Sequence, residues 1–294
     1  MPEASSAASP IDVLAAAVDR LGTPACVGLD PDPARFPGEI RVSPGANPAG
    51  AIETFCLGVI DAVCEIVPAV KPQSAHFERW GPGGYAALWR VIAHARERGL
   101  FVVLDAKRGD IGSTADHYAA GAKASGANSI TANPYLGPSG LEPFLNAPLL
   151  TYALVRTSNP DSDVVQSIVA ADGRTVAEHV AEMVDGVGRG HVGSRGLSSL
   201  GAVVGATKSE ADGERLRELM PNTPFLVPGV GAQGGTAADV RPLVRAGAKT
   251  PGECGVLVNA SRSVLYPEKT RGPWTDSVAE AAKRFADSLR AIVQ

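Results

Sequence analysis

Residues 101–119 read FVVLDAKRGDIGSTADHYA, and in this stretch an apolar run passes directly into charged side chains. The first four residues are the aromatic, β-branched and leucine types of a buried strand. Asp105, Lys107 and Asp110 follow where that strand should end. Side chains two apart on a strand point to one face, so Asp105 and Lys107 should project together. A buried strand that ends in charged groups predicts the catalytic edge of a parallel α/β fold.

Short apolar runs that end in polar or glycine-rich residues recur along the whole chain, and helix-length segments follow them. Several runs are nearly continuous in valine, leucine and isoleucine, which suits parallel strands covered by helices. Eight such units favour a (β/α)8 TIM barrel, an α/β fold, over a doubly wound sheet. The expected strands are residues 24–30, 67–72, 100–107, 128–134, 150–157, 200–207, 224–229 and 255–261.

The segments between these runs predict amphipathic helices and two long loops. Residues 209–220 begin with a serine and an acidic turn, as a capped helix should. The proline-rich residues 31–48 and the polar residues 159–173 are expected as extended loops on the catalytic face. No linker interrupts the pattern, so we expect one domain over residues 1–294 with a short N-terminal extension of about residues 1–10. The expected helices are residues 49–65, 80–98, 113–125, 174–187, 209–220, 236–247 and 275–292.

Composition excludes several classes of protein. The chain has 294 residues, 45% of them hydrophobic, and a formal net charge of -4, so no basic excess is available for nucleic acid or an anionic membrane. Its four cysteines show no C-x-x-C spacing, which argues against a zinc site or a disulfide framework. The N-terminus lacks the basic and apolar regions of a signal peptide, and no apolar run approaches transmembrane length. We therefore expect a soluble cytoplasmic protein.

Lysine and aspartate side chains from two neighbouring strands are expected to share the barrel mouth. Lys71 ends the second run, in VPAVKPQ, and would join Asp105, Lys107 and Asp110 in an array of alternating charge. An ordinary buried ion pair or a solvated loop is the alternative for such a pattern, and a solvent-facing strand end is the alternative for Lys71. In the array, a carboxylate can oppose a substrate anion, while an ammonium stabilises and protonates the carbanion left when carbon dioxide departs.

The last two strands carry the features of a phosphate site. VPGVGAQGG (residues 227–235) contains Gly229, Gly231 and Gly234, whose bare backbone lets N–H groups approach a phosphate. This G-x-G-x-x-G lies late in the chain and no acidic residue ends a strand about 20 residues later, so a dinucleotide fold is disfavoured. Arg262 follows the last strand, and its forked guanidinium suits a phosphate dianion.

Together these motifs resemble the orotidine 5'-phosphate decarboxylases, and the wording LDAKRGDIGSTADHYA resembles the longer bacterial subfamily. The resemblance covers most of the chain. It implies decarboxylation of orotidine 5'-monophosphate to uridine 5'-monophosphate, the last step of de novo pyrimidine nucleotide biosynthesis, without cofactor or metal. It also implies a homodimer in which Asp110 serves the partner's site.

The resemblance also assigns roles to single residues, residue by residue. Asp105 crowds the substrate carboxylate, Lys107 stabilises and protonates the reacting carbon, and Lys71 and Asp110 hold the charge array. The other substrate contacts that it implies are Asp30 on the ribose, Thr114 at the family's spacing from Asp110, Ser158 on the pyrimidine amide, with Thr157 as a substitute, Pro228 near the base, and Gln233 and Arg262 on the phosphate. Ser261 departs from the glycine that many relatives have before this arginine.

Three other functions remain open from the sequence. A magnesium-dependent sugar-phosphate decarboxylase or aldolase of the same barrel superfamily shares D-x-K-x-x-D, but those relatives resemble one another in a metal-binding glutamate where this chain has Lys71. A Schiff-base aldolase that uses Lys107 and a non-catalytic nucleotide-binding barrel are the others. The five histidines show no metal-ligand spacing and are expected to be structural or surface residues.

Overall fold

The computed structural model describes residues 8–40, 42–43, 45–231, 234–268 and 272–292. Eight strands close into a barrel in chain order, and each neighbouring pair is parallel. The expected (β/α)8 barrel and all eight strand positions are therefore confirmed. The strands are β1 Ala25–Leu29, β2 Ala69–Pro72, β3 Phe101–Arg108, β4 Ser129–Ala132, β5 Leu150–Arg156, β6 Leu200–Val204, β7 Phe225–Val227 and β8 Val256–Ala260.

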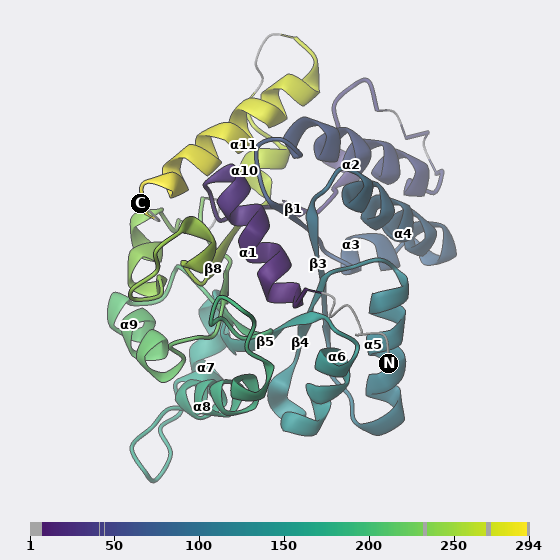
Figure 1. Ribbon diagram of the computed structural model, residues 1–294. Coiled ribbons are helices and arrows are strands. Elements are labelled where there is room, and N and C mark those ends of the chain that lie inside the picture. The colour runs from purple at the N-terminus through teal and green to yellow at the C-terminus, as the bar shows by residue number, and fades with distance from the viewer. Residues whose placement is uncertain (1–7, 41, 44, 232–233, 269–271, 293–294) are drawn as a thin grey trace, which may run out of the picture.

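Helices surround the barrel, as Figure 1 shows from the end that α1 covers. The longer ones are α1 Pro10–Leu21, α2 Ala49–Val63, α4 Gly81–Glu97, α5 Gly112–Ala124, α8 Val176–Gly188, α9 Glu210–Leu219 and α11 Trp274–Arg290. Short helical turns lie between them: α3 Ala75–Glu78, α6 Glu142–Asn146, α7 Asp163–Gln166 and α10 Arg262–Leu265. Six of the seven expected helices, all except residues 236–247, are thus present within one or two residues of their expected ends.

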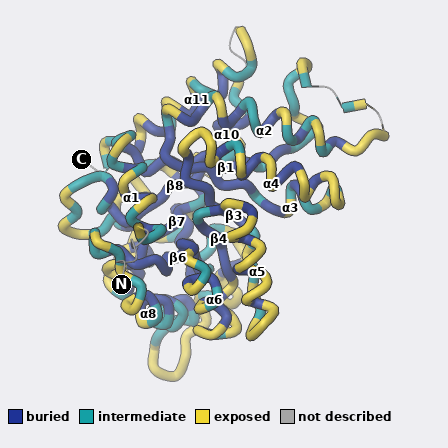
Figure 2. The backbone as a smooth tube through the Cα atoms, turned by 45° about the vertical axis from the view of Figure 1, so that its right-hand side comes forward, coloured by how far each residue is buried: buried dark blue, intermediate teal, exposed yellow. Residues whose placement is uncertain are grey.

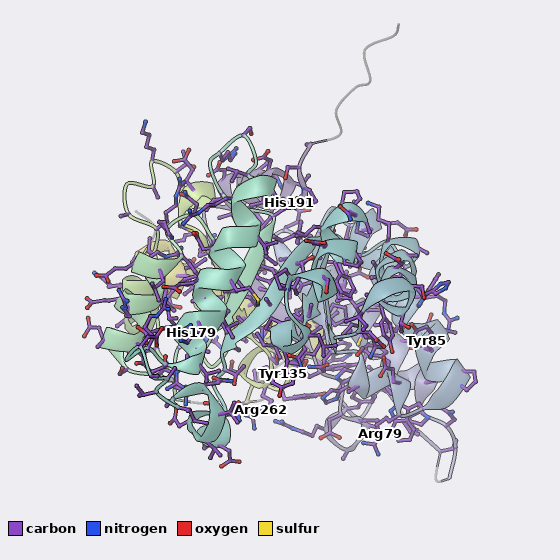
Figure 3. The ribbon with its side chains drawn as sticks, turned by 90° about the horizontal axis from the view of Figure 1, so that it is seen from below. Arg79, Tyr85, Tyr135, His179, His191 and Arg262 are labelled. Atoms are coloured by element: carbon purple, nitrogen blue, oxygen red, sulfur yellow. The ribbon has the colours of Figure 1, made fainter. Side chains whose placement is uncertain are left out.

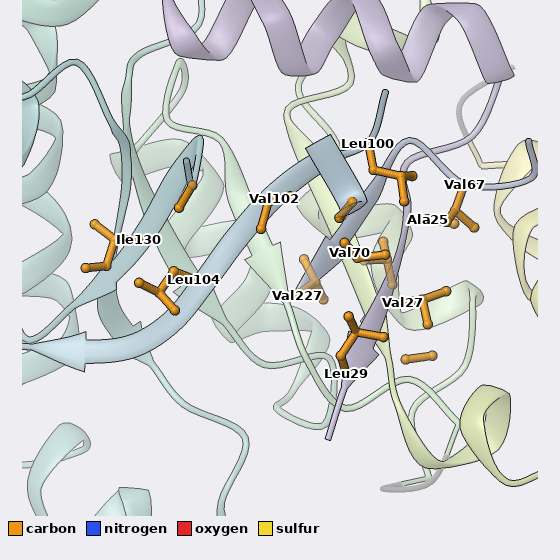
Figure 4. Packing of buried hydrophobic residues seen from close by; sticks show 14 of the residues in the cluster. Ala25, Val27, Leu29, Val67, Val70, Leu100, Val102, Leu104, Ile130 and Val227 are labelled. Carbon is orange, nitrogen blue, oxygen red and sulfur yellow. The ribbon is translucent and has the colours of Figure 1, made fainter. Parts of the chain in front are cut away.

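The strands are buried on both faces, and their alternation sorts side chains into two cores. Val27 and Leu29 of β1, with Val102 and Leu104 of β3, pack outward against the helices (Figure 4). The intervening residues point into the barrel, where they form a second cluster that includes Cys26, Phe101, Val103, Tyr152 and Leu257. The tube in Figure 2 is accordingly dark along the strands and light along the outer turns of the helices.

Helix α1 closes one end of the barrel. Ile11, Leu14 and Val18 of α1 are buried in the same cluster as the barrel interior. The helix starts at Pro10, a favourable first position, and ends at Gly22, whose positive φ of 65° suits a residue without a side chain. Asp12 accepts a hydrogen bond from the Ser194 backbone N–H at 2.8 Å and so anchors the helix. The site must therefore lie at the opposite end, where the strands finish.

Two expectations for segments outside the barrel were wrong. Residues 236–247 do not form an α-helix, because Pro242 lacks an N–H, and only a 3-10 helix over Ala238–Leu243 is present. Residues 159–173 are not simply extended, since a 3-10 turn and α7 occupy Pro160–Gln166. Among the described residues, no helix is long and apolar enough to cross a membrane.

Replacing Leu14 with alanine tests whether α1 stabilises the fold by packing against the barrel interior. Leu14→Ala is expected to lower the free energy of unfolding by about 2–5 kcal/mol, because it leaves a cavity between the helix and the barrel interior. Urea unfolding measures this change. Val13→Ala, on the exposed side of the same helix, is the matched control and should change stability by less than about 1 kcal/mol. Equal effects of the two variants would contradict the packing role.

Candidate active site

A cavity of about 620 Å³ opens at the carboxyl ends of the strands. The end opposite α1 also carries Arg262 and Tyr135, which Figure 3 shows far from His191. Most of the expected site residues line this cavity: Asp30, Lys71, Asp105, Lys107, Ser158, Pro228, Gly229 and Arg262. Residues from all eight strands and the loops that follow them converge on one space, as they do at the catalytic face of this fold.

Asp105 is at the centre of the charged group. Its carboxylate accepts a hydrogen bond from Lys71 Nζ at 2.6 Å on one oxygen and from Lys107 Nζ at 2.5 Å on the other. Lys71 and Asp105 are each only 5% exposed, whereas the Lys107 side chain is open to the cavity. One carboxylate is thus held between two cations, with the more accessible cation facing the space where a ligand would lie.

The buried charges change each other's proton affinity. Burial alone raises the pKa of the Asp105 carboxyl, but Lys71 and Lys107 outweigh burial and hold this pKa well below its usual range. Burial alone lowers the pKa of Lys71, whereas Asp105 and Asp30 raise it, and the result is a pKa above its usual value. Asp105 is therefore an anion, and Lys71 a cation, at neutral pH.

Two neutral side chains fix the Asp105 carboxylate, and the sequence analysis did not identify either. Thr131 Oγ1 donates to Asp105 Oδ1 at 2.9 Å, and Gln73 Nε2 donates to Oδ2 at 3.0 Å. Both lie on the inward face, Thr131 on β4 and Gln73 two residues after Lys71, so strand alternation could have indicated them. With four donors the carboxylate cannot easily turn away from the cavity.

The backbone at Lys107 is unusual. Its φ of 47° makes it the sole residue other than glycine with a positive φ in the described ranges, and the pairing of β3 with β4 shifts register between Leu104 and Arg108. Its N–H donates to Thr131 Oγ1 at 2.9 Å, which holds this conformation in place. Such backbone strain is typical of functional positions. The sequence predicted a regular strand here, but the backbone of β3 is irregular at Lys107, the residue whose ammonium contacts Asp105.

Asp110 and Thr114 lie apart from the group of Lys71, Asp105 and Lys107 within one chain. Neither residue lines the cavity. Asp110 Oδ1 accepts a hydrogen bond from the Ile111 backbone N–H at 2.8 Å, and Thr114 is exposed on the first turn of α5. Within a single chain the predicted array of four charges is thus a group of three.

Buried oxygen atoms without partners lie in the cavity wall. Asp30 Oδ1 is one and Asn259 Oδ1 is another, and neither has a hydrogen-bond donor in the structure. A buried acceptor left without a donor costs about 1–3 kcal/mol. Asn259 was not a candidate from the sequence, although its inward position on β8 follows from strand alternation.

The serine and threonine after β5 differ in what their hydroxyls contact. Thr157 Oγ1 donates to Asn159 Oδ1 at 2.7 Å and accepts from Gln166 Nε2 at 2.8 Å. The Ser158 side chain also lines the cavity and makes no hydrogen bond with any described residue. Of the two alternatives, Ser158 is therefore the one with a hydroxyl available to a ligand.

The glycine-rich segment and Arg262 lie together at the rim. A Cβ on Gly231 would lie 3.0 Å from Ser263 Oγ, so the segment packs against the residue that follows Arg262. The N–H groups of Gly231 and Gly234 are bonded to carbonyl groups within the segment. Arg262 is exposed and has no acidic partner among the described residues, which leaves its guanidinium available. Gln233 lies outside the described residues.

Metal ligands are not grouped in the part of the chain that the structure describes. There, no set of three or more His, Cys, Asp or Glu side chains is arranged to hold a metal ion.

Comparison with known proteins places the chain in one family. Residues 23–271 match the model of the orotidine 5'-phosphate decarboxylase / HUMPS family. The chain belongs to this family. Among similar proteins, the orotidine 5'-phosphate decarboxylases of Rhodopirellula baltica and Roseiflexus castenholzii are 40% and 41% identical to it. The first alignment covers 95% of this chain and 94% of the relative, and the second covers 92% and 93%.

Solved structures agree with this family membership. The OMP decarboxylase of Leishmania donovani superimposes with a TM-score of 0.76 at 34% identity, covering 97% of this chain and 98% of the other. The family resemblance inferred from Asp105, Lys107 and Asp110 is thereby confirmed.

The effect of Lys71 on Asp105 is testable through pH. An unfolded aspartate has a pKa of about 3.9, so ionised Asp105, with its lower folded-state pKa, stabilises the fold fully above about pH 4. That contribution is lost as pH falls through the folded-state pKa. Lys71→Met removes one cation and raises the Asp105 pKa, so stability at pH 7 should fall by about 3–5 kcal/mol.

Urea unfolding between pH 3 and pH 8 measures the effect. The gap between wild type and Lys71→Met should be widest above pH 5 and should narrow toward pH 3. Lys283→Met, at an exposed site on α11, is the control. A gap that stays constant over the whole range would refute the coupling.

Proposed function

We propose that this protein decarboxylates orotidine 5'-monophosphate to uridine 5'-monophosphate and carbon dioxide, without a cofactor, in the cytoplasm. The observation that carries the proposal is the buried pair of Lys71 and Asp105, joined by the more accessible Lys107, at the floor of a nucleotide-sized cavity. The names of the relatives support the same reaction. The four cysteines are free, which suits a reducing compartment.

The lining residues suggest how the substrate is held. Arg262 at the rim is available for the phosphate, and the Asp30 carboxylate lines the cavity where a sugar hydroxyl would lie. Ser158 and Pro228 line the part of the cavity assigned to the base, and the Ser158 hydroxyl can bond the pyrimidine amide. This placement sets the substrate carboxylate against Asp105 and Lys107. Binding energy from the phosphate end can then offset crowding at the reacting carbon.

The chemistry follows from the fixed position of Asp105. Its carboxylate is held by four donors and stays ionised, so it repels the substrate carboxylate at close range. Loss of carbon dioxide breaks the bond from C6 to the carboxylate and leaves the electron pair on C6. Lys107 Nζ stabilises that pair and transfers a proton to form the new C–H bond. Lys71 stays paired with Asp105 and keeps it charged while Lys107 acts.

A homodimer accounts for Asp110 and Thr114. Large apolar side chains are exposed beside them: Ile111, Tyr118, Leu136 and Tyr135, the last 87% exposed. The backbone carbonyl of Asp110 packs against Gly140, which brings the segment of Tyr135 and Leu136 next to it. We infer that a second copy covers this surface and that Asp110 and Thr114 of each copy contact substrate in the other.

Replacing Lys107 tests the proposed reaction. Lys107→Ala is expected to lower kcat for orotidine 5'-monophosphate by about 10³-fold or more, because it removes both the cation and the proton donor. Loss of pyrimidine absorbance measures turnover, and Lys283→Ala serves as the surface control. Near-normal turnover by Lys107→Ala would refute the proposed decarboxylation mechanism. Wild-type activity that a chelator abolishes would favour the magnesium-dependent members of the superfamily.

Mixing two inactive variants tests the shared site. Lys107→Ala and Asp110→Ala are each expected to be nearly inactive alone. If the dimer exchanges subunits at random, half of the dimers carry one intact site, and activity should return to about a quarter of the wild-type value. The assay follows turnover after co-refolding of equal amounts. No recovery, with dimers seen by sedimentation, would mean that each chain uses its own Asp110.

A further inference from the structure

Arg108, the last residue of β3, directly follows the strained residue Lys107. At Arg108 the backbone returns to pairing with β4, where it is opposite Ala132, and its carbonyl accepts a hydrogen bond from the Asn133 N–H at 2.7 Å. Unlike Lys107, Arg108 does not line the cavity. Any contact that holds Arg108 in place therefore also limits how far the backbone of Lys107 can relax.

The Arg108 guanidinium is held between two helices. Its Nη2 donates to Glu78 Oε1 at 2.5 Å, and its Cζ lies 5.3 Å from the centre of the Tyr118 ring, within the range of a cation–π contact. Glu78 is the last residue of α3, and Tyr118 lies on α5. The two charged side chains are 28% and 34% exposed, so water screens their ion pair only in part.

The turn and short helix that carry Glu78 are also bonded to Asp105. Ser74 donates its backbone N–H to the Asp105 carbonyl at 3.1 Å, and the Gln73 side chain donates to the Asp105 carboxylate at 3.0 Å. The segment that follows β2 therefore holds β3 at two points, one before Lys107 and one after it.

Close packing keeps α3 in its place. Phe77 is fully buried, and a Cβ on Gly84 of α4 would lie only 2.1 Å from the Phe77 carbonyl, so the backbones of α3 and α4 are in close contact. A residue with a side chain keeps a positive φ only where its surroundings impose it. For Lys107, these surroundings include the Thr131 hydroxyl on one side and the ion pair of Arg108 with α3 on the other.

We propose that Arg108 is a positioning residue for Lys107: its ion pair with Glu78 holds the strained backbone that directs the Lys107 ammonium to Asp105. The inference rests on the proposed function, because it takes Lys107 to be the proton donor. Without the ion pair, the end of β3 can relax toward an ordinary negative φ, and the ammonium then leaves Asp105. The reactive arrangement becomes less populated, while the residues that hold the phosphate and the base are unchanged.

Chemical labelling of lysine tests the inference without turnover. Acetic anhydride reacts with free amines, so Lys107, paired with Asp105, should react more slowly than the exposed Lys283. Peptide mass spectrometry measures both rates. Arg108→Gln and Glu78→Gln should each raise the rate at Lys107 relative to Lys283 by about two- to fivefold, the range that partly exposed ion pairs contribute.

A second ion pair between helices provides the matched control. Arg90 of α4 pairs with Glu53 of α2 and makes no contact with β3. Arg90→Gln should therefore leave the labelling of Lys107 unchanged.

Steady-state kinetics separate positioning from substrate binding. Arg108→Gln and Glu78→Gln should each lower kcat for orotidine 5'-monophosphate by about two- to fivefold, with KM within about twofold of the wild-type value. The variant with both changes should be no worse than either single variant, because both changes remove the same contact. Arg108→Lys keeps the charge and should recover part of the lost kcat.

Three results would overturn the inference. The first is wild-type labelling and kcat in both single variants, and the second is additive losses in the double variant. Because Tyr118 lies on the proposed dimer surface, the third is a loss of kcat that follows dissociation into monomers, seen by sedimentation. Faster labelling of Lys107 in variants of a protein without decarboxylase activity would refute the reaction alone. Wild-type turnover that Arg108→Gln leaves unchanged would refute the inference alone.

Discussion

The buried carboxylate of Asp105 is the constraint on which the rest of the site depends. An ionised carboxylate that is 5% exposed is costly unless cations and hydrogen-bond donors surround it. Lys71, Lys107, Thr131 and Gln73 provide these partners from three neighbouring strands and the turn after β2. The barrel must therefore hold its strands in one register for the charge to remain buried. The same requirement fixes the group that repels the substrate carboxylate.

The barrel satisfies this requirement by alternation. Outward residues such as Val102 and Leu104 bind β3 to the helices, so the odd-numbered residues Phe101, Val103 and Asp105 are left facing inward. The lower inward layers are apolar and are closed by α1, and only the last layer carries charge. Stability and chemistry thus occupy different levels of one interior, as is general for this fold.

Missing side chains shape the wall of the cavity as much as present ones do. Gly28 leaves space for Asn259 and Ser261, and a Cβ on Gly205 would lie 2.8 Å from the Ser158 backbone. Both glycines sit on the inward side of strands or just after them. Each allows a polar side chain from a neighbouring strand or loop to reach the ligand space without displacing the backbone.

The sequence by itself determined the eight strands, the family and most of the residues that line the cavity. Side-chain alternation and the ends of strands are local properties, so they can be read from a single run such as FVVLDAK. It also indicated Lys71, since the end of a parallel strand predicts the barrel mouth. Only the tertiary structure decided that Thr131 and Gln73 fix Asp105, that Asp110 stands apart within one chain, and that Ser158 rather than Thr157 has an available hydroxyl. Those facts depend on which side chains meet across strands distant in sequence. The positive φ of Lys107 and the buried Asn259 Oδ1 without a hydrogen-bond donor also arise from packing between strands. No single segment of the sequence encodes that packing.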